Sequence, residues 1–292
     1  MRRINRWTCV AATAGLLLAG AVTGAAKPLE ILTSFYPVYV ATLNVAGGVE
    51  GVTVKCLTPP VVGCLHDYQL TPGDMKAIAR ADIFVANGAG METFLGKALA
   101  QSPGLKLVDA SKGIKLAFAD NPHVWVGISG AIAQVRNIAR GLAEADPAHA
   151  AEYEKNATAY VARLEALRGE MRASLAGLKN REIITFHEAF PYFAAEFDLD
   201  IAGVIEREPG SEPAARELAE TVETVRRKKV RALFAEPQYP EKCAKVIERE
   251  TGVPVSILDP VVTGPRDPVR AKDAYIAAMR KNLDVLCRAL TE

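Results

Sequence analysis

The stretch DPAHAAEYEKNATAYVARLEALRGEMRASLAGLK, residues 146–179, decides the architecture expected for this chain. Its apolar side chains recur at steps of three or four residues, the spacing of one helix face; they are Tyr153, Ala157, Tyr160, Leu164, Leu167, Met171, Leu175 and Leu178. Asp146 is suited to cap this helix, and Pro147 to occupy its first turn. At about 1.5 Å per residue the helix would be roughly 50 Å long, which exceeds one small lobe. We therefore expect a rigid helix joining two lobes, with two shorter helices kinked near Gly169 as the alternative.

Short apolar runs alternate with helical segments on both sides of this helix. Before it, the expected strands are residues 29–33, 52–57, 83–87 and 106–108. After it, they are residues 182–186, 201–205, 230–234 and 253–258, with helices at 213–227, 240–251 and 268–290. Such alternation is typical of parallel α/β structure. We therefore expect an α/β fold of two parallel-sheet lobes, residues 27–145 and 180–292, joined by the helix 146–179.

The first 26 residues are predicted to be a cleaved export signal. Three arginines precede an uncharged apolar run, residues 10–22, which is too short to span a bilayer comfortably. Small residues at positions 24–26 offer a cleavage site before Lys27. Cys9 lies before the apolar run and not just after it, so no lipid-attachment cysteine is expected. An uncut membrane anchor is the alternative.

The charge balance argues against nucleic-acid binding. Without the three signal arginines, the 35 lysines and arginines fall to 32, against 34 acidic residues, so the mature chain carries a formal charge of −2. A nucleic-acid-binding protein is expected to be basic or to carry a basic patch. Half of the residues are hydrophobic and about a quarter are charged, as is ordinary for a globular protein.

Four cysteines remain after the signal: Cys56, Cys64, Cys243 and Cys287. Four cysteines allow three pairings, and an exported protein enters an oxidising compartment. The pairs Cys56–Cys64 and Cys243–Cys287 would keep each bridge within one lobe. Because Cys64 lies two residues before His66, a thiolate metal ligand is the alternative for Cys64.

Three of the four histidines and one aspartate stand at the ends of apolar runs or beside proline turns. They are His66 in GCLHDYQLTP, His123 in DNPHVWV, His187 in ITFHEAFPYF and Asp259 in SILDPVV. The gaps of 57, 64 and 72 residues between them exclude a zinc finger, whose ligands lie a few residues apart. Residues this dispersed meet only where a large fold converges.

Two of these residues directly follow expected strands. His187 follows residues 182–186 and Asp259 follows 253–258, and open α/β sheets bind ligands beyond the carboxyl ends of their strands. We therefore expect a metal site in the cleft between the lobes, with two ligands from each. Imidazole and carboxylate ligands suit zinc and tolerate manganese or iron.

Each residue also has a structural alternative. His66 is suited to cap the turn before Thr71, His123 to pack within its turn, His187 to cap a helix, and Asp259 to hold the turn at Pro260. The four taken together favour a metal site over four separate structural roles. His149, between alanines near the start of the long helix, is expected to be exposed and not a ligand.

Several segments, in order along the chain, resemble the motifs of one family. Residues 66–74, HDYQLTPGD, resemble the H-x-Y-x-x-T-P-x-D segment of the periplasmic zinc- and manganese-binding proteins of ABC transporters (solute-binding cluster A-I). Residues 81–92, ADIFVANGAGME, resemble A-D-x-x-x-x-N-G-x-x-x-E of the same family. NPHVW at 121–125 is similar to its P-H-x-W motif, and TFHEAF at 185–190 to its H-x-A-F motif. GSEP at 210–213, FAEPQ at 234–238 and LDP at 258–260 complete the series, which covers essentially the whole mature chain.

The resemblance implies a monomeric periplasmic protein that binds a divalent metal and delivers it to a permease in the inner membrane. The ligands it implies are His66, His123, His187 and Asp259. Three histidines with one aspartate resemble the zinc-binding members, because manganese-binding members commonly carry a second carboxylate in place of the third histidine. Zn²⁺ is therefore expected, with Mn²⁺ or iron(II) as alternatives. Disulfides in the second lobe of some members make Cys243–Cys287 the better of the two pairs.

Two departures from the family pattern bear on the identity of the metal. Zinc-binding members often carry a His-rich loop between the first two ligands, and this chain has none between His66 and His123. The residues after Trp125 also lack the proline that is usual in the family.

The sequence argues against two other classes of protein. A metallohydrolase would use Glu188 as a base, but Pro191 stands where a zincin helix needs its second histidine. A fourth ligand at Asp259 would also close the position that a catalytic zinc keeps for water. A metal-independent adhesin would show repeats or a large apolar surface pattern, and the sequence shows neither. We therefore expect a carrier and not an enzyme.

Overall fold

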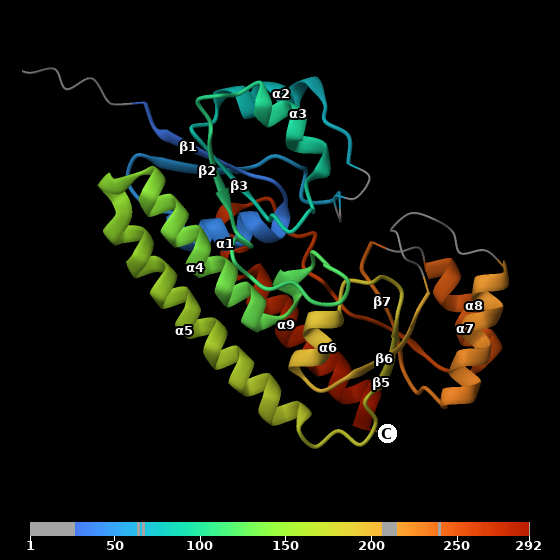
Figure 1. Cartoon of the computed structure of the whole chain (residues 1–292). Coiled ribbons are helices and arrows are strands. Elements are labelled where there is room, and N and C mark those ends of the chain that lie inside the picture. The colour runs from blue at the N-terminus through green and yellow to red at the C-terminus, as the bar shows by residue number, and fades with distance from the viewer. Residues whose placement is uncertain (1–26, 63–64, 66–67, 206–214, 239–240, 292) are drawn as a thin grey trace, which may run out of the picture.

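Two four-stranded parallel sheets form the two lobes of the protein (Figure 1). The computed structural model describes residues 27–62, 65, 68–205, 215–238 and 241–291. The first sheet comprises β1 (Leu29–Thr33), β2 (Val52–Cys56), β3 (Ile83–Ala86) and β4 (Lys106–Asp109). The second comprises β5 (Glu182–Thr185), β6 (Asp200–Val204), β7 (Leu233–Ala235) and β8 (Val255–Ile257). This confirms the expected α/β class with two parallel-sheet lobes.

The two sheets share one topology. Their strand orders are β2-β1-β3-β4 and β6-β5-β7-β8, so the second repeats the first. In each sheet the order reverses beside the first strand of the lobe, between β1 and β3 and between β5 and β7. Open parallel sheets bind ligands at such reversal points, beyond the carboxyl ends of the strands. The topology thus marks the ends of β1, β3, β5 and β7 as the places to look for a site.

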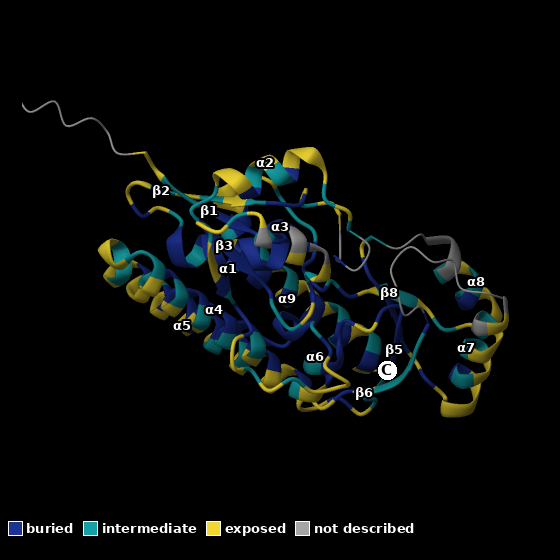
Figure 2. Ribbon diagram, turned by 45° about the horizontal axis from the view of Figure 1, so that its top comes forward, coloured by how far each residue is buried: buried dark blue, intermediate teal, exposed yellow. Residues whose placement is uncertain are grey.

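The helices complete the two lobes. In the first they are α1 (Tyr36–Ala46), α2 (Pro72–Arg80), α3 (Gly96–Ala100) and α4 (Ile128–Ala145), with short 3₁₀ turns η1 (Thr93–Leu95) and η2 (Val124–Val126). In the second they are α6 (Pro191–Glu196), α7 (Ala215–Lys228), α8 (Glu241–Thr251) and α9 (Pro268–Thr291). Nearly all of α1 is buried, as the dark blue ribbon in Figure 2 shows.

The long connecting helix is present, but it is shorter than expected. Helix α5 covers Ala150–Leu175, 26 residues or about 39 Å, and runs straight through Gly169 without a break. A 3₁₀ turn, η3 (Pro147–His149), precedes it. Asp146 stands at the N-cap of η3 and not of α5, where its carboxylate bonds His149 Nδ1 at 2.7 Å and accepts a hydrogen bond from the Tyr153 hydroxyl at 2.6 Å. The predicted apolar face is buried from Tyr153 to Leu175.

Two expected strands begin later than predicted: β8 starts at Val255 and not at residue 253, and β7 starts three residues late. The apolar run 230–234 suggested a strand from Val230, but β7 starts at Leu233. Lys229 adopts a left-handed conformation with φ of +53°, and the Val230 N–H donates to the Val225 carbonyl at 3.1 Å. This is how a helix end is closed. Val230 therefore packs as part of the end of α7, and its apolar character reports burial and not strand structure.

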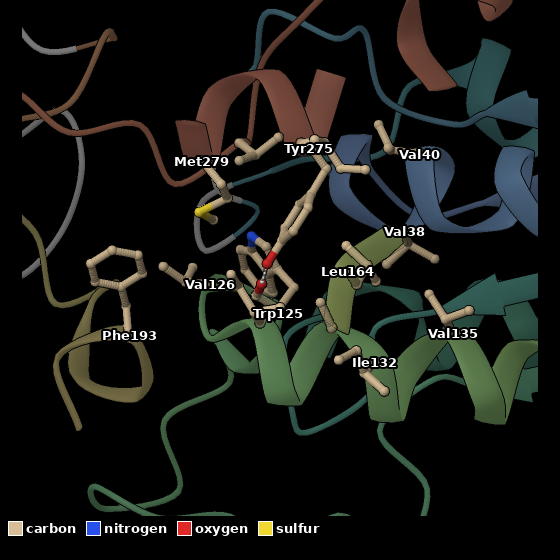
Figure 3. Packing of buried hydrophobic residues seen from close by; sticks show 14 of the residues in the cluster. Val38, Val40, Trp125, Val126, Ile132, Val135, Leu164, Phe193, Tyr275 and Met279 are labelled. Atoms are coloured by element: carbon tan, nitrogen blue, oxygen red, sulfur yellow. Dashed lines mark hydrogen bonds between the residues drawn. The ribbon is translucent and has the colours of Figure 1, made fainter. Parts of the chain in front are cut away.

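The largest of the hydrophobic clusters among the described residues runs from one lobe into the other. Figure 3 shows Trp125 at the junction, among side chains of α1, α4, α5, α6 and α9 that include Val38, Ile132, Leu164, Phe193 and Met279. Helix α9 follows the second sheet in sequence but packs on α1 and α5. The hydroxyl of its Tyr275 donates to the Trp125 carbonyl at 2.8 Å, the dashed line in Figure 3. The lobes are therefore joined by buried packing as well as by α5.

Neither favoured disulfide is formed. Cys56 and Cys287 are free thiols in this structure, while Cys64 and the side chain of Cys243 lie outside the described residues. Cys56 ends β2 in a partly buried setting, where burial raises the pKa of its thiol to about 11 despite hydrogen bonds with Thr33 and Thr58.

Across the described residues, no helix is both long enough and apolar enough to cross a membrane. The expected signal, residues 1–26, lies outside that part of the chain.

The packing of α5 generates a stability prediction with a matched control. Leu164 is fully buried at the junction of the lobes, whereas Leu107 on β4 is 55% exposed. Leu164→Ala removes buried side-chain atoms and leaves a cavity, so we expect the free energy of unfolding to fall by about 2–5 kcal/mol. Leu107→Ala should lower it by less than about 1 kcal/mol. Urea unfolding of both variants checks this, and equal losses would contradict the placement of α5 in a shared core.

Candidate metal centre

Two of the expected ligands meet at the junction of the lobes. The Nε2 atoms of His123 and His187 lie 3.2 Å apart, and their rings stand edge to face with centroids 5.0 Å apart. Both side chains are buried, at 2% and 1% exposure. Two nitrogens bound to one tetrahedral zinc at 2.0–2.1 Å would be about 3.3 Å apart. The observed separation therefore suits two nitrogens that share a metal ion.

His123 is held by the turn that precedes η2. The Asn121 side-chain oxygen accepts the His123 backbone N–H at 2.9 Å and lies 3.0 Å from Nδ1 of the ring. Asn87, which follows β3, donates its side-chain amide to the Pro122 carbonyl at 3.1 Å, and Gln134 of α4 donates to the Asn87 side-chain oxygen at 2.8 Å. Buried polar groups are stable only when hydrogen-bonded, so this network anchors the turn to the reversal point of the first sheet.

His187 follows β5, the strand beside the reversal point of the second sheet. The Phe186 backbone N–H still donates to the Phe234 carbonyl at 2.9 Å. His187 is therefore the first residue beyond the end of the sheet. Helix α6 starts only at Pro191, so His187 is not on a helix. The Asn121 side-chain amide donates to the Glu188 carbonyl at 2.8 Å, which ties this segment to the first lobe.

Asp259 is held by α9 and by its own turn. Asn282 accepts the Asp259 backbone N–H and donates to its carbonyl, both at 2.8 Å. One carboxylate oxygen of Asp259 accepts the Val261 N–H at 2.7 Å. Burial raises the pKa of this carboxyl, and the bond from Val261 opposes the rise. Val261 itself has a φ of +62°, which is strained for a β-branched residue. The turn is thus held in one conformation by its surroundings.

Trp125 links the His123 turn with the Asp259 turn. Its indole N–H donates to the Pro260 carbonyl at 2.8 Å, across the lobes. Its ring packs against His123 with centroids 5.2 Å apart, and against Phe35, which follows β1, at 5.1 Å. One aromatic side chain therefore fixes segments that carry two of the expected ligands.

His66 lies outside the described residues, but its flanks are placed. Leu65 is fully buried. The Tyr68 hydroxyl donates to the Asp74 carboxylate at 2.9 Å, and Asp74 with Thr71 forms a capping box at the start of α2. The motif thus has a local structural meaning: its Tyr68, Thr71 and Asp74 hold the chain that follows the histidine at the start of α2.

The structure unites only part of the expected ligand set. Within the described ranges, no three His, Cys, Asp or Glu side chains gather closely enough to hold a metal. His123 and His187 form a pair, and Asp259 does not join them to make such a group.

One buried carboxylate at this edge of the second sheet was not predicted to be a site residue. Glu236 follows β7 directly and is fully buried, with Gln238 donating to it. Glu236 could have been predicted from the same pattern as His187 and Asp259, which is a polar residue directly after an apolar strand.

The Asp259 turn generates a second stability prediction. Asn282 is buried at 1% exposure, so Asn282→Ala removes two bonds from backbone groups of Asp259. We expect the free energy of unfolding to fall by about 2 kcal/mol or more, because the groups left behind are poorly solvated. Asn137→Ala is the control, since its two bonds to the Ala110 and Lys112 carbonyls lie nearer the solvent. Thermal unfolding that ranks the control as equally damaging would refute the buried role of Asn282.

Comparison with known proteins places these features in a family. Residues 31–289 match the family model of the zinc-uptake complex component A, periplasmic. The chain is 30% identical over 280 residues to the zinc-binding lipoprotein AdcA of Streptococcus pneumoniae, a match that covers 88% of this chain and 55% of that protein. The chain thus spans about half the length of this relative.

Two further matches extend over nearly the full length of both partners. The high-affinity zinc uptake system protein ZnuA of Bacillus subtilis is 29% identical over 301 residues, covering 95% of this chain and 92% of that protein. Among solved structures, FpvC from Pseudomonas aeruginosa in complex with Mn²⁺ is 32% identical with a TM-score of 0.80, covering 90% of this chain and 98% of that one.

Proposed function

This chain belongs to the family of periplasmic A components of zinc-uptake complexes, and on that basis we propose that it captures zinc and delivers it to the membrane permease of an ABC importer. The observation that carries the proposal is the buried His123–His187 pair, whose nitrogens from the two lobes lie 3.2 Å apart. His66 and Asp259 are proposed to complete the set when the metal binds. Four ligands drawn from both lobes would enclose the ion between them.

The donor set favours zinc. Three imidazoles and one carboxylate form the mixed nitrogen and oxygen set that tetrahedral zinc accepts, whereas manganese prefers more oxygen ligands. The relatives AdcA and ZnuA are a zinc-binding lipoprotein and a zinc uptake protein. Manganese is the second candidate because the structural relative FpvC was solved with Mn²⁺.

The expected location and partner follow from the same family. We propose that residues 1–26 direct export and are removed, so that the mature chain works in the periplasm as a monomer. The permease in the inner membrane would then receive the metal.

The local geometry supports a carrier over a hydrolase. A zincin places two histidines one turn apart on a helix, whereas His187 lies before α6 and Pro191 begins that helix. A catalytic zinc also keeps one position open for water. Four protein ligands would fill that position, which suits holding an ion and not activating a water molecule on it.

Zinc titration of the metal-stripped protein tests the proposal. We expect one zinc per chain, and we expect His123→Ala and His187→Ala each to weaken binding by at least about 100-fold, because each removes one direct metal ligand. His149→Ala is the matched control, since His149 bonds Asp146 at the start of α5 and lies away from the pair. Competition with a chromogenic chelator gives the affinities, and circular dichroism confirms that each variant is folded.

The outcomes separate the alternatives. Tighter binding of manganese than of zinc would keep the carrier function and change its ion. Absence of zinc and manganese binding in the unaltered protein would overturn the proposal. Equal weakening by His149→Ala would show that the loss does not come from the proposed ligands.

The cross-lobe contacts generate a prediction about closure. The Trp125 indole N–H donates to the Pro260 carbonyl, and the Tyr275 hydroxyl donates to the Trp125 carbonyl. The Gly264 N–H donates to the Pro60 carbonyl at 3.0 Å. Together with the shared core and α5, these contacts leave little freedom for a hinge. We expect the radius of gyration, about 18 Å for a chain of this size, to change by less than about 1 Å when zinc binds. Small-angle scattering with and without zinc measures this, and a larger compaction would contradict the rigid connection.

A further inference from the structure

Asn121 contacts the segments of both paired histidines. It lies in the loop before His123 and is 7% exposed. Its side-chain oxygen accepts the His123 backbone N–H at 2.9 Å and lies 3.0 Å from His123 Nδ1. Its side-chain nitrogen donates to the carbonyl of Glu188, the residue after His187, at 2.8 Å. One amide thus bridges the two segments from opposite lobes.

The backbone partners fix which way this amide points. The oxygen and nitrogen of an asparagine side chain have nearly the same shape, so their assignment depends on their hydrogen-bond partners. The backbone N–H of His123 can only donate, and the backbone carbonyl of Glu188 can only accept. A flipped Asn121 would set donor against donor and acceptor against acceptor. The oxygen must therefore face His123, and the nitrogen must face Glu188.

This orientation determines the tautomer of His123. Because an amide oxygen can only accept, the ring atom that faces it, Nδ1, must carry the proton. In the neutral ring the other nitrogen, Nε2, then holds the lone pair that a metal needs. Nε2 is the atom that lies 3.2 Å from Nε2 of His187.

We propose that Asn121 is a positioning residue that sets zinc affinity, by fixing the tautomer of His123 and by tying the His187 segment across the lobes. The proposal rests on the zinc-binding function proposed above. Partners that orient a metal-binding histidine typically change metal affinity by about 10- to 100-fold. Asn121 would not touch the ion and would act only through the two histidine segments.

The loop that carries Asn121 is itself held from the second lobe. Phe118, Ala119 and Asp120 have φ values of +57°, +56° and +60°, a left-handed turn that L-residues rarely adopt. Tyr192 of α6 donates its hydroxyl to the Asn121 carbonyl at 2.8 Å, and its ring packs edge to face on Phe118 at 5.2 Å. Such strain persists only where the surroundings hold it, and it clusters at functional sites.

The tautomer can be read directly in the metal-free protein. Long-range ¹H–¹⁵N NMR of the histidine rings at pH 9, where imidazoles are neutral, distinguishes a protonated Nδ1 from a protonated Nε2. We expect His123 to be protonated at Nδ1 in the unaltered protein and to shift toward the Nε2-protonated form in Asn121→Ala. Asn121→Asp, which keeps an oxygen facing His123, should restore the Nδ1 form.

Zinc affinity tests the consequence. We expect Asn121→Ala to weaken zinc binding by about 10- to 100-fold. The control is Asn44→Ala, because the Asn44 amide also donates to two carbonyls, of Val40 and of Lys272 on α9, both at 2.9 Å. Asn44→Ala should lower thermal stability comparably and leave zinc affinity within about twofold, because Asn44 contacts neither histidine segment.

Each outcome decides the proposal. A changed tautomer together with weakened zinc binding, in a folded Asn121→Ala, supports it. Overturning results are an unchanged tautomer, an unchanged affinity, or an equal loss of affinity in Asn44→Ala. If the unaltered protein binds no zinc, the proposed function fails, whereas the NMR result still reports separately whether Asn121 sets the tautomer.

Discussion

The indole N–H of Trp125 donates across the lobes to the Pro260 carbonyl, and the arrangement of the candidate site depends on this contact. Trp125 lies two residues after His123, and Pro260 directly follows Asp259. The hydroxyl of Tyr275 on α9 donates a hydrogen bond to the backbone carbonyl of the same tryptophan. Because the indole is buried among apolar side chains, water does not compete for these two hydrogen bonds. Their donors and acceptors are therefore restricted to a small range of distances and angles. Segments from both lobes are therefore placed relative to one another before any ligand arrives.

The burial of polar residues around the histidine pair is the second constraint. Asn87, Gln134 and Asn121 would each be costly to bury without partners, and each makes the hydrogen bonds that its position demands. A satisfied network of this kind has few alternative arrangements, because moving one member leaves another unpaired. The two histidines are in consequence preorganised, so less free energy would be lost in ordering them if they bind a metal as proposed.

Much of the architecture could be predicted from the sequence, for identifiable physical reasons. The strands are short apolar runs between turns, and the buried stripe of α5 follows a simple helical period. The bounds of α1 were not predicted, because a helix that is buried nearly all round has no polar face to reveal its period. The strand predicted from Val230 was wrong because apolar character indicates burial and does not distinguish a strand from a helix end. The role of Asn121 was hidden because it depends on which atom faces which partner, and residue spacing carries no such information.

The shared core also bears on how a bound ion would leave. Separating the lobes would expose Trp125, Phe35 and Tyr275, and each aromatic side chain buries about 150–250 Å². At about 25 cal/mol per Å², exposing one of them would cost roughly 4–6 kcal/mol. A state that exposes all three would be populated far too rarely to serve as a release step. Movement of a single ligand side chain costs less, because a half-buried carboxylate such as that of Asp259 exposes little apolar surface when it shifts. In the proposed carrier, release would therefore proceed by displacement of individual ligands while the core of the two lobes stays closed.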